Sequence, residues 1–331
     1  MRLPLAMAMI AATSAFADGV PVVGEPILKP DSAFEATSWG YKKKDLSLAP
    51  APPAGQPEGY RWPTVMTMEG YDGASRPDPN AYLRMDDGEL MALRIRFGDG
   101  PRGDYAFVQA SIRGTECSGG HFDLYDRRHA LDGHHIIEWL ATQPWSNERV
   151  GMFGSSYPGQ TAYFVATTTP PHLHAISANL LHSDIYRDIF MPGAVQNFLF
   201  PSLWTYGLGV VAGPHRIPIN SIEEGTIPED EICLQAQLTR YSFGDLPQPE
   251  NEPAFAAVRA TDDQWYQAHA ALTYAHTIKI PYYQQGNWQD EQVGPRAVVL
   301  WHHIHPDPKT IIDKNGQPAT VIPKKFVLSS G

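Results

Sequence analysis

Residues 154–159, with the sequence GSSYPG, are the segment of this chain best suited to covalent chemistry. They follow the apolar run Arg149–Phe153 and lead into a helical pattern. A serine at such a strand-to-helix turn projects its hydroxyl from the carboxyl edge of a sheet, where it can attack a substrate. A glycine at position 154 leaves room in the tight turn, and the helix amino terminus offers N–H groups to an oxyanion. Ser156, which has a glycine two residues before it, is the candidate nucleophile, and Ser155 is its competitor.

This segment departs from the strict Gly-x-Ser-x-Gly pattern. Pro158 stands two residues after the serine, and Gly159 follows it. Taken alone, the segment fits a structural Gly/Ser turn as well as a nucleophile. A nucleophile at such a turn lies at the edge of a sheet, so the assignment depends on whether the neighbouring segments form strands.

Short apolar runs alternate with helical patterns along most of the chain. A helix is predicted to begin with Asp132 as its cap, and another runs over Gln160–Thr168. Strands that alternate with helices predict a parallel α/β sheet. Residues 184–275 break the alternation and are expected to form an inserted, mostly helical cap. The predicted strands are Thr64–Met68, Tyr105–Ala110, Arg149–Phe153, Ala175–Ala178, Lys279–Tyr283 and Lys324–Leu328.

The composition is that of a globular protein and excludes several classes. Hydrophobic residues make up 43% of the 331 residues and charged residues 18%. The formal net charge of −11, with no long Lys/Arg run, excludes a nucleic-acid binder that holds the backbone by charge. Two cysteines exclude a disulfide scaffold and a Cys-based zinc cluster. Their spacing leaves open whether Cys117 and Cys233 pair.

The first 17 residues predict a secretory signal peptide. Arg2 precedes a short apolar run, and small residues stand at Ala15 and Ala17. The run is shorter than the roughly 20 apolar residues that span a bilayer. We therefore expect cleavage after Ala17 and a secreted or periplasmic protein without membrane contact afterwards. Residues 18–63 are interpreted as a Pro-rich lead-in and residues 64–331 as one catalytic domain, and the oligomeric state is open.

Several short sequence motifs around the candidate nucleophile resemble those of the CocE/NonD hydrolases. This family includes cocaine-esterase-like acyl hydrolases and X-prolyl dipeptidyl-peptidases. The resemblance runs from about Thr64 to Leu328 and is densest in the first half. In this family Gly-x-Ser-Tyr-x-Gly is the usual form of the turn, so Pro158 is no departure from it. The resemblance is carried by Arg113–Gly120, Ala130–Gly133, Glu138–Leu140, Gln143–Asn147, Gly154–Gly159, Pro170–Leu173 and Asp184–Asp188.

The resemblance implies an α/β-hydrolase fold with a helical cap and gives roles to four residues. Ser156 matches the nucleophile, and Tyr157 matches the residue whose backbone N–H forms one arm of the oxyanion hole. Tyr71 falls where the family places a tyrosine whose hydroxyl forms the other arm. Asp290 matches the triad aspartate, in the chain order that this fold uses. An ordinary loop aromatic and a surface carboxylate are the alternatives for Tyr71 and Asp290.

The triad histidine is the residue that the sequence does not supply at the expected place. The family places it just after a strand like Lys325–Leu328, where this sequence ends, and its C-terminal β-jelly-roll domain is not found here. We therefore expect a truncated chain that is inactive as written. Other histidines are less suited: His302, His303 and His305 are expected at the end of a helix, His134 and His135 among polar residues at a helix start, and His182 beyond a strand, where it could face the pocket.

The leading hypothesis is a serine hydrolase that cleaves an ester, an amide or an Xaa-Pro peptide bond through an acyl-serine intermediate, with no cofactor or metal. A catalytically incomplete secreted binding protein is the second hypothesis. A metal-dependent hydrolase that uses His302, His303 and His305 is the third. Recognition of a free substrate amine would need a carboxylate near the pocket, for which Asp184, Asp188 and Glu291 are candidates.

Overall fold

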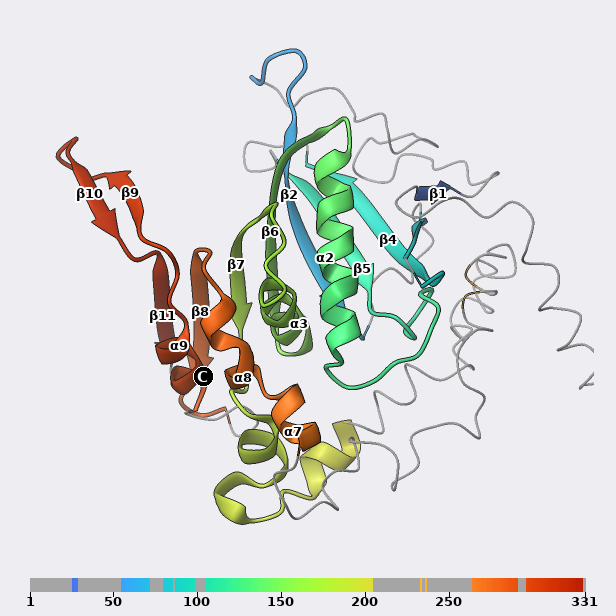
Figure 1. Ribbon diagram of the computed structural model, residues 1–331, viewed down its shortest axis with the longest axis vertical. Coiled ribbons are helices and arrows are strands. Elements are labelled where there is room, and N and C mark those ends of the chain that lie inside the picture. The colour runs from blue at the N-terminus through green and yellow to red at the C-terminus, as the bar shows by residue number, and fades with distance from the viewer. Residues whose placement is uncertain are drawn as a thin grey trace, which may run out of the picture.

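The computed structural model describes residues 26–28, 55–71, 80–85, 87–98, 105–204, 233, 236, 264–290 and 296–329. Within these residues, nine strands form one sheet in the order β1-β3-β4-β5-β2-β6-β7-β8-β11 (Figure 1). The strands from β5 to β11 run parallel, and β1, β3 and β4 add an antiparallel edge. The strands of this sheet are β1 (Pro26–Leu28), β2 (Trp62–Glu69), β3 (Asn80–Arg84), β4 (Leu90–Phe97), β5 (Ala106–Ser111), β6 (Ser146–Ser155), β7 (Leu173–Asn179), β8 (Tyr282–Asn287) and β11 (Lys324–Ser329).

Helices cover one face of the sheet, in front of it in Figure 1. α2 (Arg127–Thr142) packs on β6 and on α3 (Tyr157–Ala166), and α3 lies over β2, β6 and β7. The short α8 (Ala271–Tyr274) contacts α3 and α9 (Ala297–His303). The core between these layers is apolar, because β2 alternates buried and half-buried side chains and α3 is buried along its whole length.

Each predicted strand is present, and most boundaries agree to within a few residues. The largest shift is at Lys279–Tyr283, because the strand begins only at Tyr282 and runs to Asn287. The sequence did not predict β3 and β4, whose residues carry several polar side chains, nor the hairpin of β9 (Lys309–Ile312) and β10 (Pro318–Val321). The prediction of an α/β sheet is confirmed.

The predicted start of the helix at Asp132 is wrong. The N-cap of α2 is Asp126, six residues before the predicted cap, and its side chain accepts a hydrogen bond from the N–H of Arg128. Asp132 is instead a buried residue inside the helix and is paired with Arg113. A buried ion pair held by a partner in another element is not visible in local sequence. His134 and His135 consequently lie within the helix and not at its start.

The region after β7 is helical where the structure describes it. It contains η1 (Tyr186–Phe190), η2 (Pro192–Ala194) and helical residues 199–204, and it returns through α7 (Gln264–His269) to α8. These segments lie beyond the carboxyl ends of the parallel strands, at the bottom of Figure 1. Most of the predicted cap, between residues 205 and 263, lies outside the described residues, as do the signal peptide and most of the lead-in.

Cys117 and Cys233 form a disulfide, with their Cα atoms 4.6 Å apart. The bond joins the loop after β5 to the region between residues 184 and 275, 116 residues further along the chain. Both cysteines are buried beside Tyr82 and Ala92. None of the helices that the structure describes is both long and apolar enough to cross a bilayer.

Candidate active site

Ser156 stands at the turn between β6 and α3 in a backbone conformation that L-residues rarely adopt. Its φ is 61° and its ψ −130°, and its side chain is exposed. Its N–H donates to the carbonyl oxygen of Asn179 at 3.0 Å, which ties the turn to the end of β7. Such strain persists only where the surroundings enforce it, and it occurs preferentially at functional sites.

Two glycines make this turn possible. A Cβ on Gly154 would lie 2.3 Å from the backbone carbon of Pro158, and one on Gly159 would lie 2.5 Å from the carbonyl oxygen of Asn179. Neither distance is compatible with a side chain, because both contacts are to backbone atoms that cannot rotate away. The glycines therefore hold the sharp strand-to-helix turn that exposes Ser156, as the sequence predicted for Gly154.

A pocket of about 70 Å³ opens beside Ser156. Most of its described lining is aromatic or aliphatic, and it comes from loops after β2, β5 and β7 and from the region beyond β7. The sequence predicted Tyr71 and Ser156 here and raised His182, but it did not indicate the others, because their loops carry no periodic pattern. The described lining residues are Tyr71, Tyr125, Ser156, Leu180, His182, Ile189, Phe200 and Trp204.

The hydroxyl of Tyr71 is held by a tryptophan from the region beyond β7. The indole N–H of Trp204 donates to this hydroxyl at 3.0 Å. Because one lone pair of the oxygen is taken by this bond, the phenolic proton stays available for donation elsewhere. The Tyr71 ring also packs edge-on against Tyr157, with centroids 5.7 Å apart. The structure thus brings the predicted Tyr71 into the pocket of Ser156.

Tyr157 is the first residue of α3, where a backbone N–H has no acceptor within the helix. Its ring is buried and packs at 4.7 Å from Tyr125, and its hydroxyl accepts a hydrogen bond of 3.4 Å from the N–H of Tyr125. Burial keeps the pKa of the Tyr157 hydroxyl well above its ordinary value, against the opposing effect of the hydrogen bond from the Tyr125 N–H. The side chain therefore anchors the residue while its backbone faces the turn.

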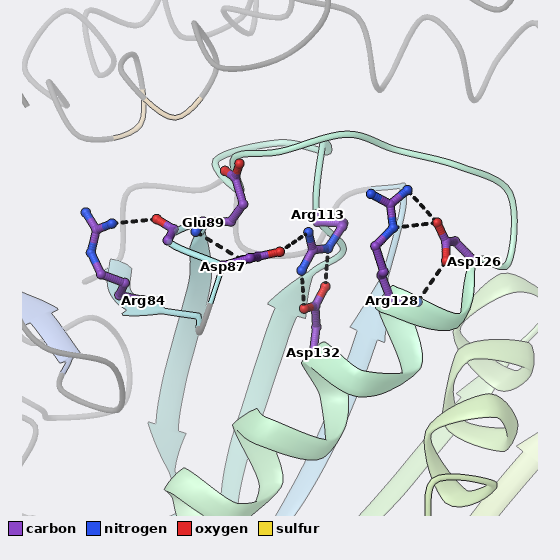
Figure 2. A network of polar contacts seen from close by, with 8 residues as sticks. Arg84, Asp87, Glu89, Arg113, Asp126, Arg128 and Asp132 are labelled. Carbon is purple, nitrogen blue, oxygen red and sulfur yellow. Dashed lines mark hydrogen bonds and ion pairs between the residues drawn. The ribbon is translucent and has the colours of Figure 1, made fainter. Parts of the chain in front are cut away.

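A network of charged side chains, in which Arg113 and Asp132 are buried, holds the loop that carries Tyr125. Arg113, just after β5, donates two hydrogen bonds to Asp132 of α2, at 2.7 and 2.5 Å, and one of 2.8 Å to Asp87 (Figure 2). Burial alone would lower the pKa of Arg113, but these hydrogen bonds outweigh it and raise that pKa, so the guanidinium stays charged. Asp126 caps α2 at the far end of the same loop. The network therefore fixes both ends of the segment from which Tyr125 reaches the pocket.

Asp290 lies at the same edge of the sheet as Ser156, three residues after the end of β8. β6 and β8 are separated by one strand, β7, so their ends lie about 10 Å apart at the usual strand spacing. Ser329, at the end of β11, lies beside Asn287, and its carbonyl oxygen accepts a hydrogen bond of 3.0 Å from the Trp288 N–H. A residue that followed β11 would emerge next to Asp290. Residues 291–295 and 330–331 lie outside the described residues.

His182 lines the pocket but is not bonded to Ser156. It is 3% exposed, and neither ring nitrogen has a hydrogen-bond partner among the residues that the structure describes. Burial lowers the pKa of His182 to about 3, against a smaller opposing effect of Asp184. An effective general base at neutral pH needs a pKa much closer to 7 and a hydrogen bond to the proton that it removes. The arrangement does not favour His182 as the triad base.

His302, His303 and His305 lie at the opposite edge of the sheet. The Lys324 ammonium, at the start of β11, donates to the carbonyl oxygens of Trp301 and Ile304 at the end of α9. The six residues of β11 span about 20 Å, so these histidines are far from the carboxyl edge. They are exposed, and among the residues that the structure describes no three His, Cys, Asp or Glu side chains converge as metal ligands. The geometry therefore removes the support for the metal-site hypothesis.

Two of the three carboxylates considered for a substrate amine already have partners. Asp184 accepts a hydrogen bond from the N–H of Arg187 and is paired with its guanidinium. Asp188 accepts from Ser183 and is paired with Arg296 at 2.5 Å, and neither aspartate lines the pocket. Glu291 lies outside the described residues. The described lining of the pocket contains no carboxylate.

A family model for the X-Pro dipeptidyl-peptidases of the S15 family matches residues 48–317. The chain belongs to this family. A proposed serine esterase of Mycobacterium bovis is 31% identical over 145 residues, and the cocaine esterase of a Rhodococcus strain is 35% identical over 86. These alignments cover 44% and 26% of this chain but only 21% and 15% of the relatives' own lengths. The chain thus matches about a fifth or less of these relatives.

A solved CocE/NonD hydrolase from Staphylococcus aureus has the same fold. It superimposes with a TM-score of 0.51 at 20% identity, over 74% of this chain and 39% of its own. The predicted α/β-hydrolase fold and the CocE/NonD resemblance are confirmed.

Proposed function

We propose that this S15-family chain cleaves an ester or amide bond through an acyl intermediate on Ser156. The single observation that carries the proposal is the strained turn at Ser156, which opens beside a pocket and is enforced by two glycines. The Ser156 oxygen attacks the substrate carbonyl carbon while a base removes its proton. The bond to the leaving alcohol or amine then breaks and the leaving group takes the proton, after which water hydrolyses the acyl-serine.

The proposed oxyanion hole consists of the Tyr157 backbone N–H and the Tyr71 hydroxyl. The first is an N–H at the amino terminus of α3, and the second retains its proton for donation because Trp204 occupies a lone pair. The two donors come from different elements, and the Tyr71–Tyr157 ring contact fixes their relative position.

Asp290 is proposed as the carboxylate of the catalytic triad. The support for Asp290 is its position after β8 at the carboxyl edge of the sheet, where only β7 separates β8 from β6. β11 runs alongside β8, so Ser329 at its end lies at the same edge of the sheet as Asp290. A triad histidine would accept the Ser156 proton, and the Asp290 carboxylate would orient its ring and stabilise its charged form.

The proposal is tested with p-nitrophenyl esters and Xaa-Pro anilides on the full-length gene product. Ser156→Ala is expected to remove nearly all turnover, because the nucleophile is lost. Ser155→Ala is the matched control, since its side chain is also exposed at the same turn, and it is expected to retain most activity. Normal turnover by Ser156→Ala together with an inactive Ser155→Ala would overturn the assignment.

We also propose that the protein is exported after removal of residues 1–17. The support is the signal-like amino terminus together with the disulfide between Cys117 and Cys233, since such bonds persist in oxidising compartments. Fractionation of expressing cells is the test: the mature chain is expected outside the cytoplasm and to begin at Asp18, whereas a cytoplasmic chain that retains Met1 would contradict the proposal.

A further inference from the structure

The pocket beside Ser156 contains a buried histidine that the catalytic machinery does not use. His182 is 3% exposed and lines the pocket, and within the described part of the chain neither of its ring nitrogens has a hydrogen-bond partner. Its ring packs at 5.0 Å from that of Tyr125. The backbone is placed by Gln160 of α3, whose side-chain amide donates to the His182 carbonyl oxygen at 3.4 Å. A buried polar group without a partner is costly to the folded state, so its presence in a binding pocket points to a ligand that supplies the partner.

The charge state of His182 defines which ligand groups it can bind. Because burial lowers the pKa of His182 to about 3, the ring is neutral at physiological pH. A neutral imidazole offers one N–H donor and one lone pair, and no net charge. Such a ring favours an uncharged polar atom, such as an ether, hydroxyl or carbonyl oxygen, over a carboxylate or an ammonium group.

The size of the pocket limits the group that carries this atom. Its volume of about 70 Å³ is less than half of the roughly 150 Å³ of an apolar cavity that holds benzene. Because a single water needs about 10–15 Å³ by this measure, the pocket holds a small group of several non-hydrogen atoms. The remaining walls, from Leu180, Ile189 and Phe200, are apolar. A short chain fits these walls and a benzoyl ring does not.

We propose that this pocket binds the acyl side of the substrate and that His182 selects short acyl groups bearing an uncharged oxygen close to the carbonyl carbon. The proposal rests on the proposed function, because it places the acyl group on Ser156. His182 acts here through a hydrogen bond to the substrate and takes no part in proton removal from the serine.

Two isosteric esters test the proposal on the full-length gene product. p-Nitrophenyl butyrate and p-nitrophenyl methoxyacetate differ by the replacement of one methylene by an ether oxygen, so their ratio of kcat/KM isolates the polar contact. This ratio is divided by the ratio of their rates with hydroxide, which removes the intrinsic reactivity. The normalised ratio is expected to favour methoxyacetate about tenfold or more, because a buried donor left without a partner penalises the butyrate. A normalised ratio near one in the wild-type protein would overturn the proposal.

Substitutions at position 182 identify the source of the preference. His182→Leu is expected to bring the normalised ratio to about one, and His182→Asn, which keeps a donor and an acceptor, to retain most of it. Ile189→Val is the matched control, because it alters the apolar wall only, and it is expected to leave the ratio unchanged. If His182→Leu and His182→Asn lower kcat/KM equally for both esters and leave the ratio unchanged, His182 has a structural role and the proposal is contradicted.

The rate of labelling by a small fluorophosphonate separates this proposal from the proposed function. Labelling of Ser156 at the wild-type rate in each variant shows that the fold and nucleophile are intact. Absence of labelling at Ser156 in an active wild-type protein would overturn the proposed function itself. p-Nitrophenyl benzoate serves as the size test: turnover as efficient as that of the butyrate would contradict the assigned pocket.

Discussion

At the scale of single residues, the decisive feature is the backbone of the turn at Ser156. Gly159→Ala places a methyl group about 2.5 Å from the Asn179 carbonyl oxygen, which also accepts the Ser156 N–H. We expect a loss of stability of about 1–3 kcal/mol and a much larger loss of kcat/KM, since the turn that aims the serine must open. Urea unfolding and ester hydrolysis measure the two effects. Wild-type activity in this variant would contradict the role of the turn.

Tyr71 allows a test of the oxyanion hole at the same scale. Tyr71→Phe keeps the ring contact with Tyr157 and removes only the hydroxyl, so kcat is expected to fall about 10²–10³-fold. Trp204→Phe, which removes the indole donor to this hydroxyl, is expected to cause a smaller loss. If Tyr71→Phe stays within about twofold of the wild type, the second donor lies elsewhere.

At the scale of elements, the pair of Arg113 and Asp132 links β5 to α2 and so holds the loop of Tyr125. Asp132→Leu leaves the Arg113 guanidinium without its bidentate partner and is expected to cost about 3–5 kcal/mol. The double variant Arg113→Met with Asp132→Leu removes both charges and is expected to recover much of this loss. Urea unfolding of the single and double variants gives the free energies of unfolding for a double-mutant cycle. Additive losses in the double variant would show that the two residues act independently.

The same elements show how far sequence alone reaches. Apolar runs such as Thr64–Met68 and Arg149–Phe153 are strands in which buried side chains alternate with more exposed ones. Their period and composition are local properties, so they could be predicted. The start of α2 could not, because Asp132 fits a cap by type and only its distant partner Arg113 keeps it inside the helix. Ser156 and Tyr71 could be named from motifs and a family resemblance. The roles of Tyr125, Trp204 and His182 could be identified only from the structure, because loops that are distant in sequence bring them together.

At the scale of the whole molecule, the disulfide ties the loop after β5 to the region beyond β7. Cys117→Ser with Cys233→Ser is expected to lower the free energy of unfolding by about 2–5 kcal/mol, because the closed loop is long. Thermal unfolding of the double variant measures the loss, and dithiothreitol should change the wild-type protein but not the variant. A double variant that is as stable as the wild type would contradict this role.

The central claim is that Ser156 becomes acylated. The full-length gene product is treated with a fluorophosphonate until hydrolysis of p-nitrophenyl butyrate stops, and the labelled residue is identified by peptide mass spectrometry. We expect one adduct per chain, on Ser156, with loss of activity in proportion to labelling. An adduct on Ser155 or another residue, or full turnover after Ser156 is blocked, would contradict the account.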